Sequence, residues 1–273
     1  MTDDNSRIAF IGGGNMASAI IGGLVKQGLA PAQIAVVEPF AEARARLAQQ
    51  FGVQAQEQAG AGLASAALVV WAVKPQTFKD AAAQARAHVR QALQLSVAAG
   101  IRSDSIAAWL GTERIVRSMP NTPALVGKGM TALYARPAVT AADQARVEQV
   151  IATTGEHLWV AQEQQLDAVT ALSGSGPAYV FYFLEAMTQA GAEMGLSAEQ
   201  ARRLAVGTFA GASELARASN EPLQTLRERV TSKGGTTYAA LSSMEQDQVK
   251  AAFVKALHAA CKRAEELGNE FGK

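Results

Sequence analysis

Residues 231–237, Thr-Ser-Lys-Gly-Gly-Thr-Thr, place two glycines and a cluster of hydroxyl groups directly before an amphipathic helical pattern. Glycine lets the backbone come close to a ligand, and the first N–H groups of a helix have no partners within the helix. Those N–H groups and the neighbouring hydroxyls can together hold a small carboxylate. The segment therefore predicts a binding site for a small anionic substrate.

A second glycine-rich segment lies near the other end of the chain, where residues 8–17 read Ile-Ala-Phe-Ile-Gly-Gly-Gly-Asn-Met-Ala. An apolar strand leads into Gly-x-Gly-x-x-Ala and then into a helix, which is the order of a dinucleotide-binding turn. Gly12 permits the tight turn, Gly14 lets the backbone approach the pyrophosphate, and Ala17 allows close helix packing. The phosphates would lie at the helix N-terminus.

Glu38 ends the next apolar run, at the position where an acidic residue bonds the ribose 2′-hydroxyl of NAD and repels the 2′-phosphate of NADP. Arg44 and Arg46 lie close enough in sequence to soften that preference. The alternative is that Glu38 is a solvated loop carboxylate.

Three further loops follow predicted strands at their carboxyl ends, where open α/β sheets bind ligands. They are Ala-Val-Lys-Pro at residues 72–75, Val-Ala-Ala-Gly at 97–100 and Met-Pro-Asn-Thr-Pro at 119–123. The small side chains of the second loop leave room for a flat nicotinamide ring. Three such loops at one edge favour a shared pocket.

Residues 173–177, Ser-Gly-Ser-Gly-Pro, open an apolar helix with two hydroxyls and exposed N–H groups, a second terminus suited to an anion. Glu163 is either a cleft residue able to bond an amine or imine, or an ordinary linker charge, and the sequence leaves both open. His88, His157 and His258 have no metal-ligand spacing. Their placement argues against metal catalysis and against a histidine acid.

The elements that must position these residues change in type at about residue 160. Before it, short β-branched runs alternate with helical stretches, as in βαβ units around a parallel sheet. The strands are expected at residues 8–11, 34–37, 68–73, 93–97, 115–118, 130–134 and 157–160, with helices at 16–27, 41–51, 76–89, 103–110 and 142–154. From residue 166 onward the patterns are helical. The prediction is an α/β chain: a Rossmann-type, mainly parallel sheet domain at 1–162, then an all-α domain at 163–273 for substrate binding and dimerisation.

Local signals support these helices. Thr140-x-x-Asp143 and Ser197-x-x-Gln200 read as N-terminal capping pairs, and Pro177 suits the first residue of a helix running to about Met194. Residues 178–184, Ala-Tyr-Val-Phe-Tyr-Phe-Leu, are apolar on every face. In so small a domain, a partner subunit is expected to cover part of that helix.

The composition narrows the partners and the compartment. A formal charge of +1 offers no basic surface for nucleic acid and no polybasic membrane patch. Cys261 is the single cysteine, the first residues are polar, and the apolar runs are too short for a membrane helix. A cytoplasmic protein with small-molecule ligands and copies of itself as partners is expected.

Taken together, these segments resemble pyrroline-5-carboxylate reductase. The resemblance rests on residues 11–17, 72–75, 97–101, 119–123, 167–179 and 230–237, which keep the family's order and spacing over nearly the whole chain. It implies an NADPH- or NADH-dependent reduction of 1-pyrroline-5-carboxylate to L-proline, the last step of proline biosynthesis. It also implies a Rossmann domain and a helical domain that forms interleaved homodimers or higher homo-oligomers.

Carried over position by position, the resemblance assigns Thr237 as the catalytic hydroxyl that bonds the ring nitrogen, Thr236 as a backbone contact to the carboxylate, and Glu163 as a contact to proline. The predicted substrate-binding residues are Glu163, Ser173, Ser175, Ser232, Gly234, Gly235, Thr236 and Thr237. The predicted cofactor-binding residues are Ile11, Gly12, Gly13, Gly14, Asn15, Met16, Glu38, Ala72, Val73, Lys74, Pro75 and Ala99, and no metal site is expected.

Two residues depart from the family's pattern. Lys233 stands where the family usually has proline in Ser-Pro-Gly-Gly, and Glu38 stands where members that favour NADP often carry a small residue.

Two other functions stay open. One is a β-hydroxyacid dehydrogenase, although residues 174–179 lack the lysine that such enzymes use; the other is a non-catalytic sensor of dinucleotide or amino acid.

Overall fold

The computed structural model describes residues 7–272, which form two compact units. The first unit contains the chain up to Ser175 together with the residues from Ala260 onward, and the second is Gly176–Ala259. Each unit is a set of residues that contact one another more than they contact the rest of the chain. The predicted division into residues 1–162 and 163–273 rests on the change from α/β to helical sequence patterns, and it stays a prediction.

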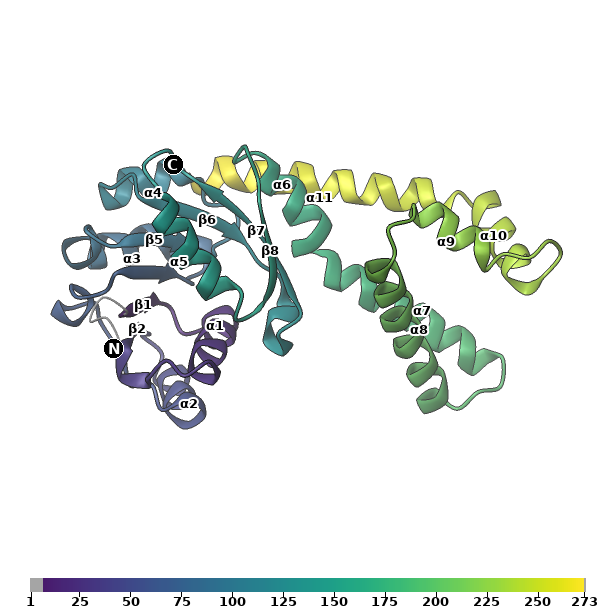
Figure 1. Ribbon diagram of the computed structural model, residues 1–273, viewed down its shortest axis with the longest axis horizontal. Helices are drawn as coiled ribbons and strands as arrows, with labels where there is room; N and C mark the ends of the chain where they lie inside the picture. The colour runs from purple at the N-terminus through teal and green to yellow at the C-terminus, as the bar shows by residue number, and fades with distance from the viewer. Residues whose placement is uncertain (1–6, 273) are drawn as a thin grey trace. The chain divides into compact units, whose positions relative to one another are not determined.

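An eight-stranded sheet forms the centre of the first unit (Figure 1). Its strand order is β3-β2-β1-β4-β5-β6-β7-β8, and every neighbouring pair is parallel except β6 and β7. The strands are β1 (Ile8–Ile11), β2 (Ile34–Val37), β3 (Ala55–Gln56), β4 (Leu68–Trp71), β5 (Leu93–Ser96), β6 (Ile115–Met119), β7 (Gly129–Ala135) and β8 (Gly155–Trp159). The mainly parallel Rossmann-type sheet that the sequence predicts is confirmed.

Alternation along the strands gives the sheet two hydrophobic faces. Ile8 and Phe10 of β1 pack with the helices α1 (Asn15–Lys26), α2 (Ala41–Phe51) and α5 (Ala141–Ile151). Ala9 and Ile11 face the other way, toward α3 (Pro75–Val89) and α4 (Ser103–Leu110). Both faces are therefore covered, as a parallel sheet requires. The buried sheet carries its loops at fixed positions along one edge.

The predicted caps form as expected. Asp143 N–H donates to Thr140 Oγ1 at 3.2 Å, while Thr140 N–H donates to Asp143 Oδ2 at 3.1 Å. Ser197 and Gln200 make the same reciprocal pair at the start of α8 (Ala198–Ala218). Short 3-10 turns complete the first unit at η1 (Pro31–Gln33), η2 (Ala61–Leu63) and η3 (Thr122–Val126).

The structure corrects three details of the expected elements. The strand predicted at residues 68–73 ends at Trp71, because Lys74 already caps α3 and Pro75 begins it. The two-residue strand β3 is too short to give a period-2 signal. The antiparallel pairing of β7 was not foreseen either, since alternation along a strand does not reveal its direction.

The second unit is entirely helical in its described residues. It holds α7 (Gly176–Glu193), α8, α9 (Leu223–Arg229), α10 (Thr236–Gln246) and the start of α11 (Val249–Phe271). Helices α7 and α8 pack closely, because a Cβ on Gly191 would lie only 2.8 Å from Cβ of Ala201. The rings of Tyr179 and Phe183 meet Phe253 edge-on.

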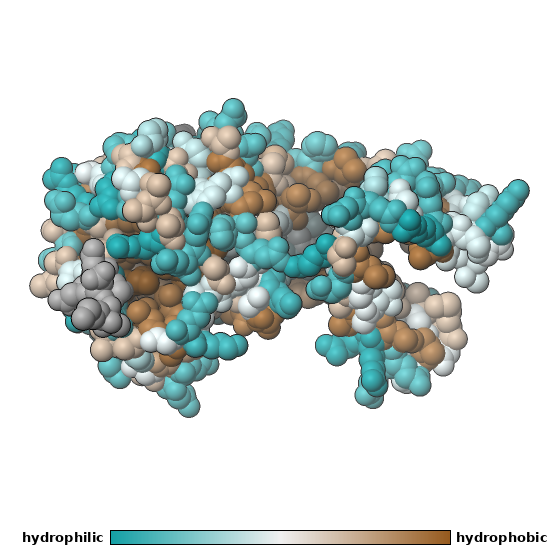
Figure 2. Space-filling model, viewed as in Figure 1, coloured by the Kyte–Doolittle hydropathy of each residue, from teal (hydrophilic) through white to brown (hydrophobic). Residues whose placement is uncertain are grey.

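Large hydrophobic side chains remain on the surface of this second unit, and Figure 2 shows apolar patches on its helices. Tyr182 is 70% exposed and Leu215 is 71% exposed. A domain that buried its own apolar surface would not leave this many large side chains in water.

No helix within residues 7–272 has both the length and the apolar character to cross a membrane.

Candidate active site

The glycine-rich turn between β1 and α1 is fixed by both neighbouring strands. Gly12 N–H donates to the carbonyl of Val37 at 2.8 Å, and Ala72 N–H donates to the carbonyl of Ile11 at 2.8 Å. Gly12 has φ +97°, and a Cβ there would lie 2.5 Å from the carbonyl oxygen of Ala72. Only glycine fits this position. The structure thus brings two predicted cofactor segments, residues 11–16 and 72–75, into direct contact.

The start of α1 is open to an anion. Gly14 is its N-cap, Asn15 its first residue, and no side chain within the described residues caps it. A Cβ on Gly14 would meet no atom within 4 Å, which leaves space beside the free N–H groups. Ala17 is fully buried against the sheet, as the close packing of this helix requires. This geometry fits a dinucleotide pyrophosphate.

The neighbouring loops also lie at the carboxyl ends of their strands. Val73 and Lys74 follow β4 and lead into α3 at Pro75, with the Thr77 hydroxyl donating to the Lys74 carbonyl at 3.0 Å. Ala99 follows β5, which pairs with β4. Gly100 takes φ +70° beside Leu267 and Phe271 of α11. The predicted cofactor residues therefore share one edge of the sheet.

Glu38 is held by the backbone of two loops. Its Oε2 accepts a hydrogen bond from Gly13 N–H at 2.7 Å, and its Oε1 accepts one from Phe40 N–H at 2.9 Å. The residue is only 6% exposed, so it is not the solvated loop carboxylate of the alternative interpretation. Arg44 donates to the carbonyls of Glu38 and Pro39. The carboxylate therefore occupies a fixed position beside the glycine-rich turn.

Glu163 is a partly buried ion-pair partner, not an ordinary linker charge. Its carboxylate accepts hydrogen bonds from the Ser103 N–H and hydroxyl, both at 2.6 Å, and from Arg117 at 3.1 Å. Ser103 is the first residue of α4, so Glu163 places a negative charge at a helix N-terminus, where it is favourable. The side chains of Arg117 and Glu163 are 3% and 14% exposed.

Asp167 lies in the same charged cluster, and the sequence interpretation did not single it out. Burial raises the pKa of this carboxyl, although Arg117 and Arg102 act in the opposite direction. Arg117 was missed too. A charged residue in the middle of the predicted strand 115–118 was the available signal, because a buried strand holds an arginine only with a partner.

Residues 170–174 form a π-helical turn, η4 (Thr170–Gly174), between α6 (Gln165–Val169) and α7. The Ser173 hydroxyl in this turn is buried and has no hydrogen-bond partner among the described residues. Such turns are frequent at functional sites. Ser175 N–H donates to the Thr170 carbonyl at 2.8 Å, which closes the turn.

The turn packs against the Met-Pro-Asn-Thr-Pro loop. A Cβ on Gly174 would collide with the methyl group of Met119. Asn121 donates to the Ser173 carbonyl at 3.2 Å and accepts from Met130 N–H at 2.9 Å. Two motifs about fifty residues apart in the sequence are therefore joined within the first unit.

The loop at residues 231–235 leads into α10 in the second unit, which begins at Thr236. Gly234 takes φ +76°, and Gly235, the N-cap, donates to the Ser232 carbonyl at 3.0 Å. A Cβ on Gly235 would lie 2.6 Å from the Ser232 hydroxyl oxygen. Thr236 and Thr237 begin the helix, whose N-terminus no described side chain caps. The loop has the expected form of an anion-binding terminus.

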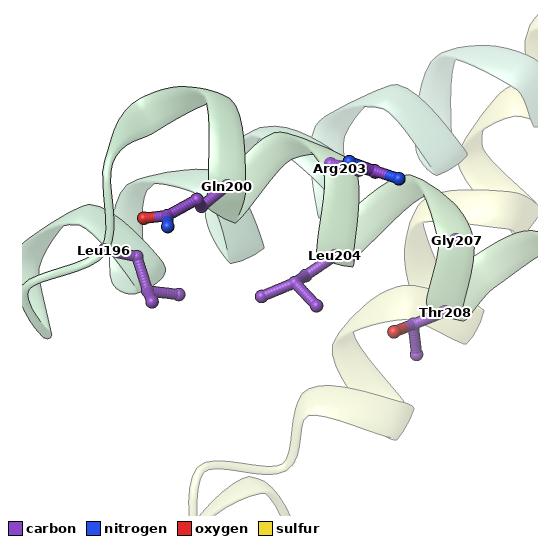
Figure 3. Close-up of a pocket in the computed structure, with 6 residues that line it drawn as sticks. All are labelled: Leu196, Gln200, Arg203, Leu204, Gly207 and Thr208. Carbon is purple, nitrogen blue, oxygen red and sulfur yellow. The ribbon is translucent and has the colours of Figure 1, made fainter.

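Two pockets in the second unit include no predicted site residue. One lies along α8 and is lined by Leu196, Gln200, Arg203, Leu204, Gly207 and Thr208 (Figure 3). The other lies between α7 and α8.

Within residues 7–272, no group of three histidine, cysteine or acidic side chains could hold a metal ion.

The sheet, the glycine-rich turn and the open helix start define an oxidoreductase of the Rossmann type. Residues 7–100 match the family model described as NADP oxidoreductase, coenzyme F420-dependent, and residues 163–267 match pyrroline-5-carboxylate reductase dimerisation. The chain belongs to the pyrroline-5-carboxylate reductase family, as the relatives below show.

The enzyme of this name from Pseudomonas aeruginosa is 47% identical over 98% of both chains. That of Haemophilus influenzae is 40% identical over 97% of this chain and 98% of its own. Among solved structures, pyrroline-5-carboxylate reductase from Coxiella burnetii aligns with a TM-score of 0.88 and 37% identity over 96% of this chain and 98% of its own. The Plasmodium falciparum enzyme, solved with NADP bound, aligns with a TM-score of 0.87 and 28% identity, over 97% and 99%.

Proposed function

We propose that this protein reduces the C=N bond of 1-pyrroline-5-carboxylate to give L-proline, the last step of proline biosynthesis, with NADPH or NADH as the hydride donor. The observation that carries the proposal is the loop at residues 231–237, which places two glycines and Thr237 at an uncapped helix start. Full-length identity of 47% to a pyrroline-5-carboxylate reductase supports it.

The cofactor residues are assigned to the first unit. The N–H groups at the start of α1 would hold the pyrophosphate, and Glu38 would accept a hydrogen bond from the ribose. The small residues at 97–100 leave room for the nicotinamide. The proposed set is Ile11, Gly12, Gly13, Gly14, Asn15, Met16, Glu38, Ala72, Val73, Lys74, Pro75 and Ala99. When bound, the cofactor supplies a hydride from C4 of its nicotinamide ring.

The substrate carboxylate is assigned to the loop of the second unit. Ser232, Gly234 and Thr236 offer N–H and hydroxyl donors to it, and Gly235, whose N–H is bonded to the Ser232 carbonyl, lets the loop come close to the substrate. The Thr237 hydroxyl would hydrogen-bond the ring nitrogen. An imine protonated at nitrogen already accepts hydride readily, so the site orients the ring and needs no strong general acid. Addition of a hydride at C5 would form the new C–H bond while the C=N π electrons move to nitrogen, which gives proline.

Three residues of the first unit also belong to the predicted substrate-binding set. Ser173 and Ser175 belong to the turn that packs on residues 119–121, and the free Ser173 hydroxyl supports a ligand role. Glu163 accepts two hydrogen bonds at Oε1 and one at Oε2, so a role toward proline would use the one lone pair left on Oε2.

Initial rates with pyrroline-5-carboxylate and each nicotinamide cofactor test the function. We expect Thr237→Ala to lower kcat by about one to three orders of magnitude, as expected when one hydrogen bond to a reacting centre is lost. Thr237→Ser should keep most of the rate because it keeps the hydroxyl. Ser242→Ala, on an exposed position of α10, is the matched control. Activity of Thr237→Ala within twofold of the parent would reject the catalytic role.

The same assay separates the competing functions. A β-hydroxyacid dehydrogenase would oxidise 3-hydroxy acids with NAD(P) and leave the imine unreduced, and a sensor would bind ligands without turnover. Either result would contradict the proposal.

We also propose a cytoplasmic homodimer or larger homo-oligomer. The match of residues 163–267 to a dimerisation family model and the exposed apolar side chains of α7 and α8 support self-association. A single cysteine that forms no disulfide within the chain is in keeping with the cytoplasm.

A further inference from the structure

The Ser173 hydroxyl is buried without a partner, unlike two threonine hydroxyls in the neighbouring helical turns. Thr170 donates to the Leu166 carbonyl at 2.7 Å. Thr188 of α7 donates to the Leu184 carbonyl at the same distance of 2.7 Å. Both are the usual bond of a helical hydroxyl to the carbonyl four residues before it. Ser173 makes no such bond, and because an unpartnered buried hydroxyl lowers stability, its presence needs an explanation.

The π-helical turn that contains Ser173 is wider than a turn of α-helix. Ser175 N–H donates at 2.8 Å to the Thr170 carbonyl, five residues earlier, whereas an α-helix bonds residues four apart. Within residues 7–272, the other buried hydroxyls without a partner are those of Ser18 and Thr131, which lie inside the regular elements α1 and β7. Among these three residues, Ser173 alone combines an unused hydroxyl with an irregular turn, and such turns are frequent at functional sites.

The carboxamide of Asn121 holds this turn from outside. Its Nδ2 donates to the Ser173 carbonyl at 3.2 Å, and its Oδ1 accepts from Met130 N–H at 2.9 Å. A carbonyl can only accept and an N–H can only donate, so the two ends of the amide cannot be exchanged. Asn121 lies two residues after β6, and Met130 belongs to β7, which pairs with β6. The amide therefore ties the turn to two strands of the sheet.

Asn121 also lies at the edge of the sheet where the nicotinamide is proposed to bind. Strand β6 is parallel to β5, and the small residues at 97–100 follow β5 at the same edge. The Ser118 hydroxyl donates to the Ser96 carbonyl at 2.8 Å, which joins the ends of these two strands. The turn that Asn121 holds is thus bonded to the loop next to the one proposed for the reacting ring of the cofactor.

We propose that Asn121 is a positioning residue of the reductase. Its carboxamide keeps the π-turn in the form that leaves the Ser173 hydroxyl without a helical acceptor, and Ser173 donates this hydroxyl to the carboxylate of the pyrroline substrate. A hydrogen bond to a charged acceptor, made only when substrate binds, then offsets the instability of the unpartnered hydroxyl. The inference rests on the proposed reductase function and gives a role to a residue outside the predicted site residues.

Steady-state kinetics and thermal melts of the intact protein test this role. Ser173→Ala should raise KM for pyrroline-5-carboxylate about tenfold or more, because a hydrogen bond to a charged group is lost. The same change should keep or raise Tm, because it removes a buried hydroxyl that has no partner. Asn121→Asp keeps the acceptor for Met130 but loses the donor to the Ser173 carbonyl, so KM should rise by a similar factor.

The double variant Asn121→Asp with Ser173→Ala separates positioning from an independent effect. If Asn121 acts through Ser173, KM of the double variant should stay within about twofold of that of Ser173→Ala alone, whereas independent effects would multiply. Asn269→Ala is the matched control. It removes a side-chain hydrogen bond with Arg102 from an exposed position of the first unit, and KM should stay within about twofold of the parent value.

A lowered Tm with an unchanged KM in Ser173→Ala would show a structural hydroxyl and overturn the proposal. Effects that multiply in the double variant would overturn it as well. If the parent protein reduces pyrroline-5-carboxylate and both single variants keep its KM, the positioning role is refuted and the proposed function stands. A parent protein without this activity would refute the proposed function, and the positioning role with it.

Discussion

Two aspartates of the first unit show how one residue type responds to opposite surroundings. Burial raises the pKa of Asp167, and the arginines near it do not fully offset this. Burial also acts on Asp143, but hydrogen bonds from Arg114 and Thr140 outweigh it and hold the pKa below its usual value. The ionised form is therefore penalised at Asp167 and favoured at Asp143.

The stability of the protein should follow these shifts in opposite directions. A raised pKa in the folded state means that the folded state binds the proton more tightly, so Asp167 costs stability as pH rises through its folded pKa. Asp143 contributes stability that is lost as pH falls through its depressed pKa. At pH 7, Asp167→Asn should therefore raise Tm or leave it unchanged, and Asp143→Asn should lower it.

Melting curves from neutral pH to about pH 4 check Asp167→Asn, and melts at neutral pH check Asp143→Asn, with the parent protein under the same conditions as the reference. The gain from Asp167→Asn should shrink on acidification, because the parent carboxyl becomes protonated. A gain that grows toward acid pH would contradict the direction assigned to Asp167.

Residue types at this scale were partly readable from the sequence. The glycines of both loops could be predicted from the backbone freedom of glycine. The position of Glu38 could be predicted because it directly follows an apolar strand pattern. The partners of Glu163 did not, because Ser103 and Arg117 lie 60 and 46 positions away and only the folded sheet brings them near. The choice between a cleft residue and a linker charge needed those contacts.

At the scale of elements, the turn between β1 and α1 separates two kinds of glycine. Gly12 has a left-handed backbone and touches the Ala72 carbonyl, whereas Gly14 has an ordinary φ of −73° and open space around it. Gly12 is needed for folding the turn. Gly14 leaves room for a ligand.

Alanine at each position should expose this difference. Gly12→Ala should lose at least about 1–2 kcal/mol of folding free energy from the backbone alone, and the clash with Ala72 adds to it. Gly14→Ala should keep Tm within a degree or two and raise the NADH dissociation constant about tenfold or more. Thermal melts and calorimetry measure both, and unchanged cofactor binding by Gly14→Ala would remove the turn from the pyrophosphate site.

Most element positions followed from periodicity and caps, since strand β1, strand β2 and helices α2 and α4 have the predicted bounds. The reversal of β7 and the π-turn at residues 170–174 did not. The direction of β7 depends on how the chain packs in the folded sheet, which hydrophobic periodicity does not encode. The π-turn is only five residues long, so it is too short to produce a recognisable hydrophobic period.

At the scale of the whole molecule, the exposed apolar side chains of the second unit predict self-association. Leu204 on α8 is 58% exposed and lines the pocket of Figure 3. Leu204→Asp should raise the subunit dissociation constant about a hundredfold or more, because a buried unpaired carboxylate is costly. Sedimentation velocity over a range of concentrations measures it.

Leu125→Asp serves as the control, because Leu125 is similarly exposed, at 54%, but lies in η3 of the first unit. A parent protein that is monomeric at micromolar concentration would contradict the proposed oligomer. So would an oligomer that survives Leu204→Asp and other charged substitutions on α7 and α8.

The return of α11 to the first unit has a consequence for synthesis on the ribosome. Leu267 and Phe271 pack on Gly100, and Arg102 donates to Asn269 at 3.4 Å. These residues are translated after the whole second unit, so the nucleotide-binding sheet emerges long before its last packing partners. Until they are synthesised, the residues around Gly100 lack these contacts, and incompletely packed apolar surface of this kind is where chaperones bind nascent chains.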